Sequence, residues 1–122
     1  MHELSICQQL INQVEAIAYE HRAWRVNAIH LQIGPLAGIE IPLLKQAFTV
    51  ACANTLAESA TLETKPAPIR VRCRTCGAES EALANRLLCG TCGDWHTDLL
   101  SGDEMLLVSL ELDLEYKEEK HV

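Results

Sequence analysis

Two copies of a Cys-x-x-Cys-Gly motif constrain the fold of this chain more than any other feature. They are Cys73–Gly77 (CRTCG) and Cys89–Gly93 (CGTCG). Two residues between cysteines let one tight turn direct both thiolates at a single ion, and the glycine that follows suits a turn with positive φ. Four thiolates complete a tetrahedral zinc site and leave no position for water or substrate. The sequence therefore predicts a structural Zn²⁺ held by Cys73, Cys76, Cys89 and Cys92.

Two disulfides or two redox-active pairs are the alternative interpretation of these motifs. A cytosolic chain keeps its thiols reduced, and no βαβ pattern surrounds either pair, so zinc is favoured. His96, four residues after Cys92, is a candidate replacement ligand, although an exposed loop histidine is the favoured interpretation. Cys7 and Cys52 lie on apolar helical faces and are expected to be small buried hydrophobes.

The composition is that of a small soluble protein with one core and room for one small module. Of the 122 residues, 48% are hydrophobic and 22% are charged, and the net charge is −7. An acidic chain repels phosphate backbones, so we expect no nucleic-acid partner. The sequence shows neither a long apolar span nor a basic region typical of a secretory signal, so we expect no membrane association and a cytoplasmic location.

Hydrophobic periodicity predicts the remaining elements. Apolar residues three and four apart predict an amphipathic helix from about residue 3 to 18 and a second helix from Pro42 to about Asn54. Strict alternation predicts strands, with Ala28 and His30 on the polar face of the first of them. The predicted strands cover residues 27–33, 61–65, 69–73 and 106–114.

These elements predict an α+β fold, a small mainly antiparallel sheet with two helices on one face, plus an inserted zinc-ribbon module. In the last strand, Leu106, Val108, Leu110, Leu112 and Leu114 are expected to share one buried face. The predicted domains are residues 1–68 with 104–122, and residues 69–103 for the zinc ribbon. Few large apolar residues surround the cysteines, so metal binding should supply much of the folding free energy of that module.

Several motifs together resemble the HypA/HybF family of hydrogenase maturation proteins. They are MHELS at the start, IGPL at residues 33–36, the two CxxCG pairs and GDEM at residues 102–105. The resemblance implies a nickel metallochaperone that takes Ni²⁺ to the precursor of the [NiFe]-hydrogenase large subunit with the GTPase HypB. It places the nickel ligand at His2 and the zinc ligands at the four cysteines. It leaves open whether the chain is a monomer or a homodimer.

The chemistry of the N-terminus agrees with a nickel site at His2. The Met1 amine with the amide and imidazole nitrogens of His2 forms one chelating stretch, and nitrogen-rich planar sites suit Ni²⁺. Glu3 and Glu40 are further candidate ligands. No nucleophile–base pair or phosphate-binding loop is present, so we expect no enzymatic activity. The alternative function is a zinc-ribbon adaptor that binds protein or nucleic acid without a second metal.

Overall fold

The computed structural model describes residues 3–114 of the chain, and it contains two helices and six strands in that range. Residues 1, 2 and 115–122 lie outside the described range. They include the predicted nickel ligand His2. The elements are α1 (Glu3–Glu20), β1 (Ala23–Ile33), α2 (Ile41–Ala51), β2 (Thr61–Pro66), β3 (Arg70–Cys73), β4 (Glu79–Glu81), β5 (Thr97–Ser101) and β6 (Met105–Leu114).

The two helices form where the apolar spacing predicted them. α1 carries Glu3 in its first turn, where a carboxylate favours the positive end of the helix dipole. α2 has Pro42 in its first turn, where the helix requires no hydrogen bond from a backbone N–H. The helix buries Leu44 and Phe48. The two helices pack against each other. Within the described residues, neither helix is both long and apolar enough to span a bilayer.

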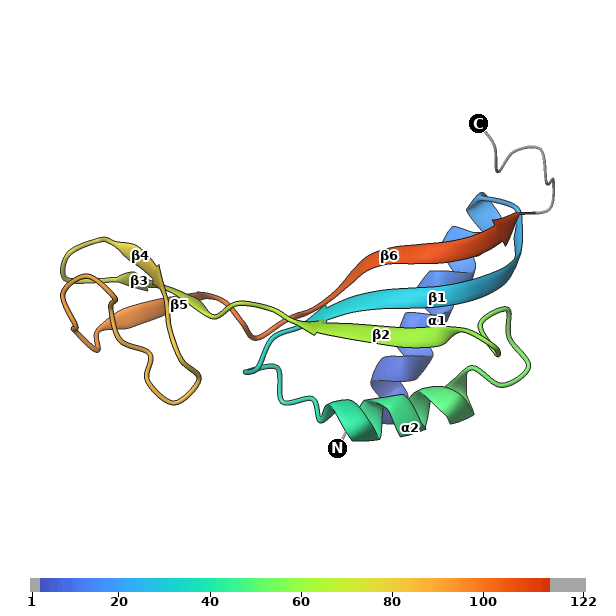
Figure 1. The fold of residues 1–122 in the computed structure, drawn as a ribbon, viewed down its shortest axis with the longest axis horizontal. Helices are drawn as coiled ribbons and strands as arrows, with labels where there is room; N and C mark the ends of the chain where they lie inside the picture. Colours follow the sequence, from blue (N-terminus) through green and yellow to red (C-terminus); the bar gives the residue numbers. More distant parts are fainter. Residues whose placement is uncertain (1–2, 115–122) are drawn as a thin grey trace. The chain divides into compact units, whose positions relative to one another are not determined.

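The first sheet is mixed, with strand order β2-β1-β6 (Figure 1). Two hydrogen bonds show that β1 and β2 run parallel. Thr61 donates to the carbonyl of Asn27 and Ala67 donates to that of Ile33, and the partners in both pairs are equally far apart in the sequence. Parallel neighbours need a long crossover, and α2 provides it. In the second sheet, order β4-β3-β5, both pairings are antiparallel. The predicted α+β architecture with a ribbon module is confirmed.

The chain divides into two compact units. Among the described residues, 3–31, 40–64 and 107–114 form the first unit, and 32–39 with 65–106 form the second. The core of the first unit comes from α1, β1 and α2, where Val14, Val26, Ile29 and Leu44 are fully buried. The second unit has a smaller core around Val71, and it contains all four motif cysteines.

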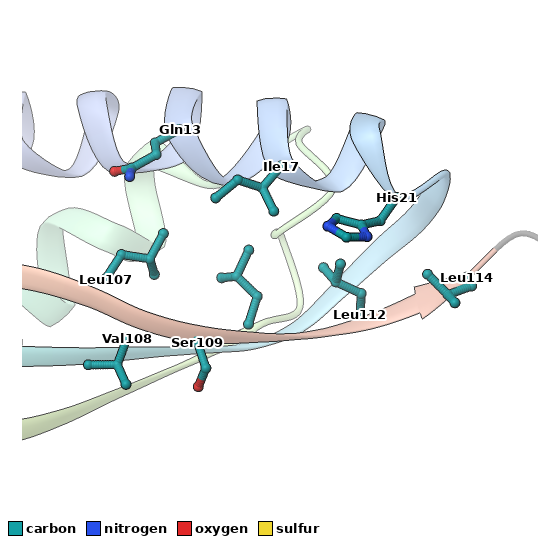
Figure 2. Close-up of a pocket in the computed structure, with 9 residues that line it drawn as sticks. Gln13, Ile17, His21, Leu107, Val108, Ser109, Leu112 and Leu114 are labelled. Carbon is teal, nitrogen blue, oxygen red and sulfur yellow. The ribbon is translucent and has the colours of Figure 1, made fainter. Parts of the chain in front are cut away.

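The predicted faces of β1 and β6 need correction. Ala28 is buried rather than on the polar face, because the burial pattern of β1 changes phase between Ala28 and Ile29. In β6, Leu106 and Val108 are exposed, and Figure 2 shows Val108 and Ser109 both turned away from α1. Two consecutive residues on one side interrupt the alternation, as β-bulges do on edge strands. The predicted single buried face from Leu106 to Leu114 is therefore wrong at its first two positions.

Candidate metal centre

Each Cys-x-x-Cys-Gly motif forms the same tight turn. The N–H of Gly77 donates to the carbonyl of Cys73 at 3.0 Å, and that of Gly93 donates to the carbonyl of Cys89 at 2.9 Å. Both glycines have positive φ, +77° and +78°, which a side chain would strain. The predicted role of these glycines is therefore confirmed. The turns return the second cysteine of each pair toward the first.

The two turns bring the four cysteine sulfurs together. The sulfurs of Cys73, Cys76, Cys89 and Cys92 all lie within 4.8 Å of one another. Two of the separations are 3.6 Å (Cys73 to Cys92) and 3.5 Å (Cys76 to Cys89). A tetrahedral ion with Zn–S bonds of about 2.3 Å separates its sulfurs by about 3.8 Å. The cluster therefore fits one metal ion such as zinc.

Backbone amides favour the thiolate form of the first cysteine in each pair. The amides of Thr75 and Cys76 donate to the sulfur of Cys73 at 3.3 and 3.4 Å. The amides of Thr91 and Cys92 donate equivalent hydrogen bonds to the sulfur of Cys89, each at 3.3 Å. These bonds, of which the one from Cys92 contributes most, lower the pKa of Cys89 to about 6. Four thiolates this close repel one another, so the cluster requires a cation to hold all four in the ionised state.

A polar network around Asp94 ties the two turns together. The Thr75 hydroxyl donates to the Asp94 carboxylate, and His96 donates to it from its backbone N–H and its ring. These hydrogen bonds hold the pKa of Asp94 well below its usual range, and the bond from Thr75 contributes most. His96 stacks on Trp95 and does not join the sulfur cluster, as expected of a loop histidine. Thr75 and Asp94 could not be predicted from the sequence, because such partners carry no spacing signal.

Two further candidate ligands predicted from sequence, Glu3 and Glu40, lie at the N-terminal ends of the two helices. His2 and Met1 lie outside the described residues. Glu3 is buried, with 7% of its surface exposed, and it lines one cleft together with Leu43 and Gln46 of α2. Glu40 is the residue that precedes α2, and its side chain makes no capping hydrogen bond. The starts of α1 and α2 are therefore adjacent.

Two arginines of the second unit form ion pairs with carboxylates on neighbouring strands. Arg72 pairs with Glu79 at 2.7 Å, and Arg74 pairs with Asp98 at 2.6 Å. Arg70 stands opposite Glu81 in the β3–β4 register. A basic patch that binds nucleic acid needs arginines whose charge is not already balanced. This face of the ribbon therefore offers little attraction to phosphate.

The sequence of residues 1–112 matches the model of a family described as "Hydrogenase/urease nickel incorporation, metallochaperone, hypA". The chain belongs to the HypA family. The predicted resemblance to HypA/HybF proteins is confirmed, and the match includes the N-terminus and both cysteine pairs.

Relatives and solved structures agree with this assignment to the HypA family. "Hydrogenase maturation factor HypA" of Nitrosospira multiformis is 51% identical over 112 residues, covering 92% of this chain and 97% of the relative. The protein of the same name from Aquifex aeolicus is 39% identical, covering 94% of this chain and 100% of the relative. The solution structure of the Ni metallochaperone HypA from Helicobacter pylori has a TM-score of 0.74 at 25% identity, covering 94% and 100% of the two chains.

Proposed function

We propose that this chain is a nickel metallochaperone that binds Ni²⁺ at its N-terminus and delivers it during maturation of [NiFe]-hydrogenase. The family match across residues 1–112 is the observation that carries this proposal. The neighbouring starts of α1 and α2 support it, because they carry two candidate carboxylate ligands, Glu3 and Glu40, and Glu3 follows His2 directly in the sequence.

The proposed nickel ligands are the imidazole and amide nitrogens of His2 and the amine of Met1, with Glu3 or Glu40 as a further ligand. Nitrogen donors in one chelating stretch favour the planar geometry that Ni²⁺ adopts. A site at the end of the chain can open toward an acceptor without unfolding the core. Ease of release is what distinguishes a carrier site from the closed cysteine cluster.

The four cysteines would hold zinc in a structural role. When bound, zinc supplies the cross-link that fixes the two turns of the second unit. The chain's own part is to position four sulfurs and to stabilise thiolates through backbone amides. Because the sulfurs fill a tetrahedron, the site offers no coordination position for a substrate. We assign no catalytic activity to it.

The proposed acceptor is the precursor of the hydrogenase large subunit, and the proposed helper is the GTPase HypB, both in the cytoplasm. Family membership supports these partners. The alternative of a zinc-ribbon adaptor for nucleic acid gains no support from the second unit, where Arg72 and Arg74 are ion-paired.

Calorimetric nickel titration of the zinc-loaded chain tests the proposed site. We expect His2→Ala, and any tag fused directly before Met1, to abolish nickel binding. Zinc content and the helix signal in circular dichroism should stay unchanged. The matched control is His21→Ala, which removes an exposed histidine after α1. Glu3→Gln and Glu40→Gln, measured separately, show which carboxylate is the further ligand.

Two outcomes would reject the nickel site. One is nickel binding by the His2→Ala protein with the affinity and stoichiometry of wild type. The other is an equal loss of binding in the His21→Ala control, which would indicate nonspecific coordination by surface histidines. A chain that binds zinc but no nickel would favour the adaptor function.

A further inference from the structure

The two cysteine turns have equivalent backbone hydrogen bonds. The Cys73 N–H donates to the carbonyl of Ala78, and the Cys89 N–H donates to that of Asp94 at the corresponding position of the second turn, both at 2.9 Å. The sulfur separations of 3.6 and 3.5 Å are equivalent too, because each joins the first cysteine of one turn to the second cysteine of the other. The backbone therefore does not distinguish the two turns.

The side chains do distinguish them. Thr75 and Thr91 occupy the same position, directly before the second cysteine of each motif. The Thr75 hydroxyl donates to the carboxylate of Asp94, at the end of the second turn. Ala78 stands where Asp94 has its counterpart in the first turn, and within residues 3–114 the Thr91 hydroxyl makes no hydrogen bond. The turns are therefore joined by a side-chain hydrogen bond on one side only.

Asp94 uses both of its carboxylate oxygens to hold the first turn. Oδ2 accepts the bond from Thr75, and Oδ1 accepts bonds from the backbone N–H and the ring Nδ1 of His96, at 3.1 and 2.8 Å. The carbonyl of His96 in turn accepts the N–H of Arg74, in the first turn, at 2.8 Å. Hydrogen bonds to a charged carboxylate are stronger than those between neutral groups. The network around Asp94 therefore reaches the first turn through a side chain and through the backbone.

Holding the turns together bears directly on how long a metal ion stays bound. Each turn supplies two of the four sulfurs, so an ion bound to all four is lost only when the sulfurs of one turn move away from those of the other. The bond from Thr75 to Asp94 crosses between the turns and resists that movement. Groups that orient metal ligands from outside the ligand set commonly contribute about ten- to a hundredfold to metal affinity.

We propose that Asp94 is a positioning residue of the metal centre, which slows the loss of the ion by holding the first turn against the second. It acts through Thr75 and His96 and is not part of the sulfur cluster. This inference rests on the proposed zinc site and is independent of the proposed nickel site.

Transfer of zinc from the full-length, zinc-loaded chain to a chromophoric chelator, extrapolated to zero chelator, measures the rate of ion loss. Thr75→Val removes the hydroxyl and should raise this rate about tenfold. Its matched control is Thr91→Val, the same change at the corresponding position, so the difference between the two variants reports the hydrogen bond to Asp94. Thr75→Ser keeps a hydroxyl and should restore a rate within about threefold of wild type.

A double-mutant cycle shows whether Thr75 acts through Asp94. Asp94→Ala should raise the rate at least as much as Thr75→Val. Combining the two changes should have no greater effect than Asp94→Ala alone, because the second change removes a bond that is already lost. Glu79→Gln controls for general loosening of the unit, since it breaks the ion pair with Arg72 without touching either turn, and it should leave the rate unchanged.

The proposal is overturned if Thr75→Val and Thr91→Val have the same effect, or if the effects of Thr75→Val and Asp94→Ala multiply. An equal increase with Glu79→Gln would also overturn it. Metal analysis of wild type comes first. A chain that holds well under one equivalent of zinc would reject the zinc site and this inference with it, whereas a zinc-loaded chain with unchanged rates would reject only the role of Asp94. Because Thr75 and Thr91 are exposed, we expect their variants to fold, and circular dichroism checks this.

Discussion

The carbonyl oxygen of Gly102 occupies the place where a side chain on Gly34 would begin. The two segments are joined at this point, because the Gly34 N–H donates to the carbonyl of Glu104 and the Leu36 N–H donates to that of Gly102, each at 2.8 Å. The atoms nearest to this place are backbone atoms of Gly102 and Asp103, so no flexible side chain could move to make room for a larger residue at position 34. Gly34 therefore permits the close approach of two chain segments within the second unit.

We expect Gly34→Ala to lower the free energy of unfolding of the second unit by about 3 kcal/mol. The added methyl group can be accommodated only by separating the two hydrogen-bonded segments. Urea unfolding of the zinc-loaded protein, followed by Trp95 fluorescence in a Trp24→Phe background, measures this. The control is Gly38→Ala, where φ is +74° but nothing lies within 4 Å of the added atom. It should cost only about 1 kcal/mol, and equal losses would show that steric overlap is not the cause.

Leu44→Ala should destabilise the first unit by about 3 kcal/mol. Leu44 is fully buried, so truncation leaves a cavity beneath α2. Val50, on the same helix, is 68% exposed, and Val50→Ala should change the free energy of unfolding by less than about 0.5 kcal/mol. Thermal unfolding followed at the helix signal measures both. Zinc content should not change in either variant, and a loss of zinc in Leu44→Ala would contradict the separation into two units.

Zinc removal should unfold the second unit and leave the first folded. The second unit has a small core, and two of its buried residues, Cys73 and Cys89, are themselves proposed ligands. The first unit contains both helices and the larger core. Chelation should therefore change Trp95 fluorescence while the far-UV helix signal is retained. Loss of most of the helix signal would show that the first unit depends on the metal.

The stability of the first unit should fall at alkaline pH because of Cys7. Burial, with smaller contributions from Cys52 and Glu3, raises the pKa of Cys7 from 9.0 to about 11. Above pH 9 the thiol ionises in the unfolded chain but keeps its proton in the folded one, so stability present below pH 9 is lost as pH rises toward 11. The loss amounts to about 2 kcal/mol. Urea unfolding should show a smaller alkaline loss in Cys7→Ala than in wild type, and identical slopes would exclude this cause.

The helices and the cysteine cluster could be predicted from the sequence because local patterns encode them. The spacing of Cys73, Cys76, Cys89 and Cys92 fixes two turns, and the glycine after each pair fixes the sign of φ. The apolar spacing of α1 is similarly local. Pro42 marks the first turn of α2 within one residue of its observed start.

The faces of the strands could not be predicted in the same way. Strict alternation assumes a regular strand, and a single phase change reverses every side chain beyond it. Such changes occur at Ala28–Ile29 and at Val108–Ser109, where the residues are apolar or small and give no warning. The Asp94 network and the burial of Glu3 beside α2 depend on tertiary packing, which no spacing rule describes.

The four sulfurs of the cysteine cluster differ in how solvent reaches them. Cys73 and Cys89 are buried, whereas Cys76 and Cys92 are exposed. We therefore expect an oxidant or alkylating agent to reach the second cysteine of each pair first. The buried sulfurs accept hydrogen bonds from backbone amides, which stabilise their thiolates. Chemical damage to the metal centre thus proceeds from one side, beginning with one sulfur of each turn.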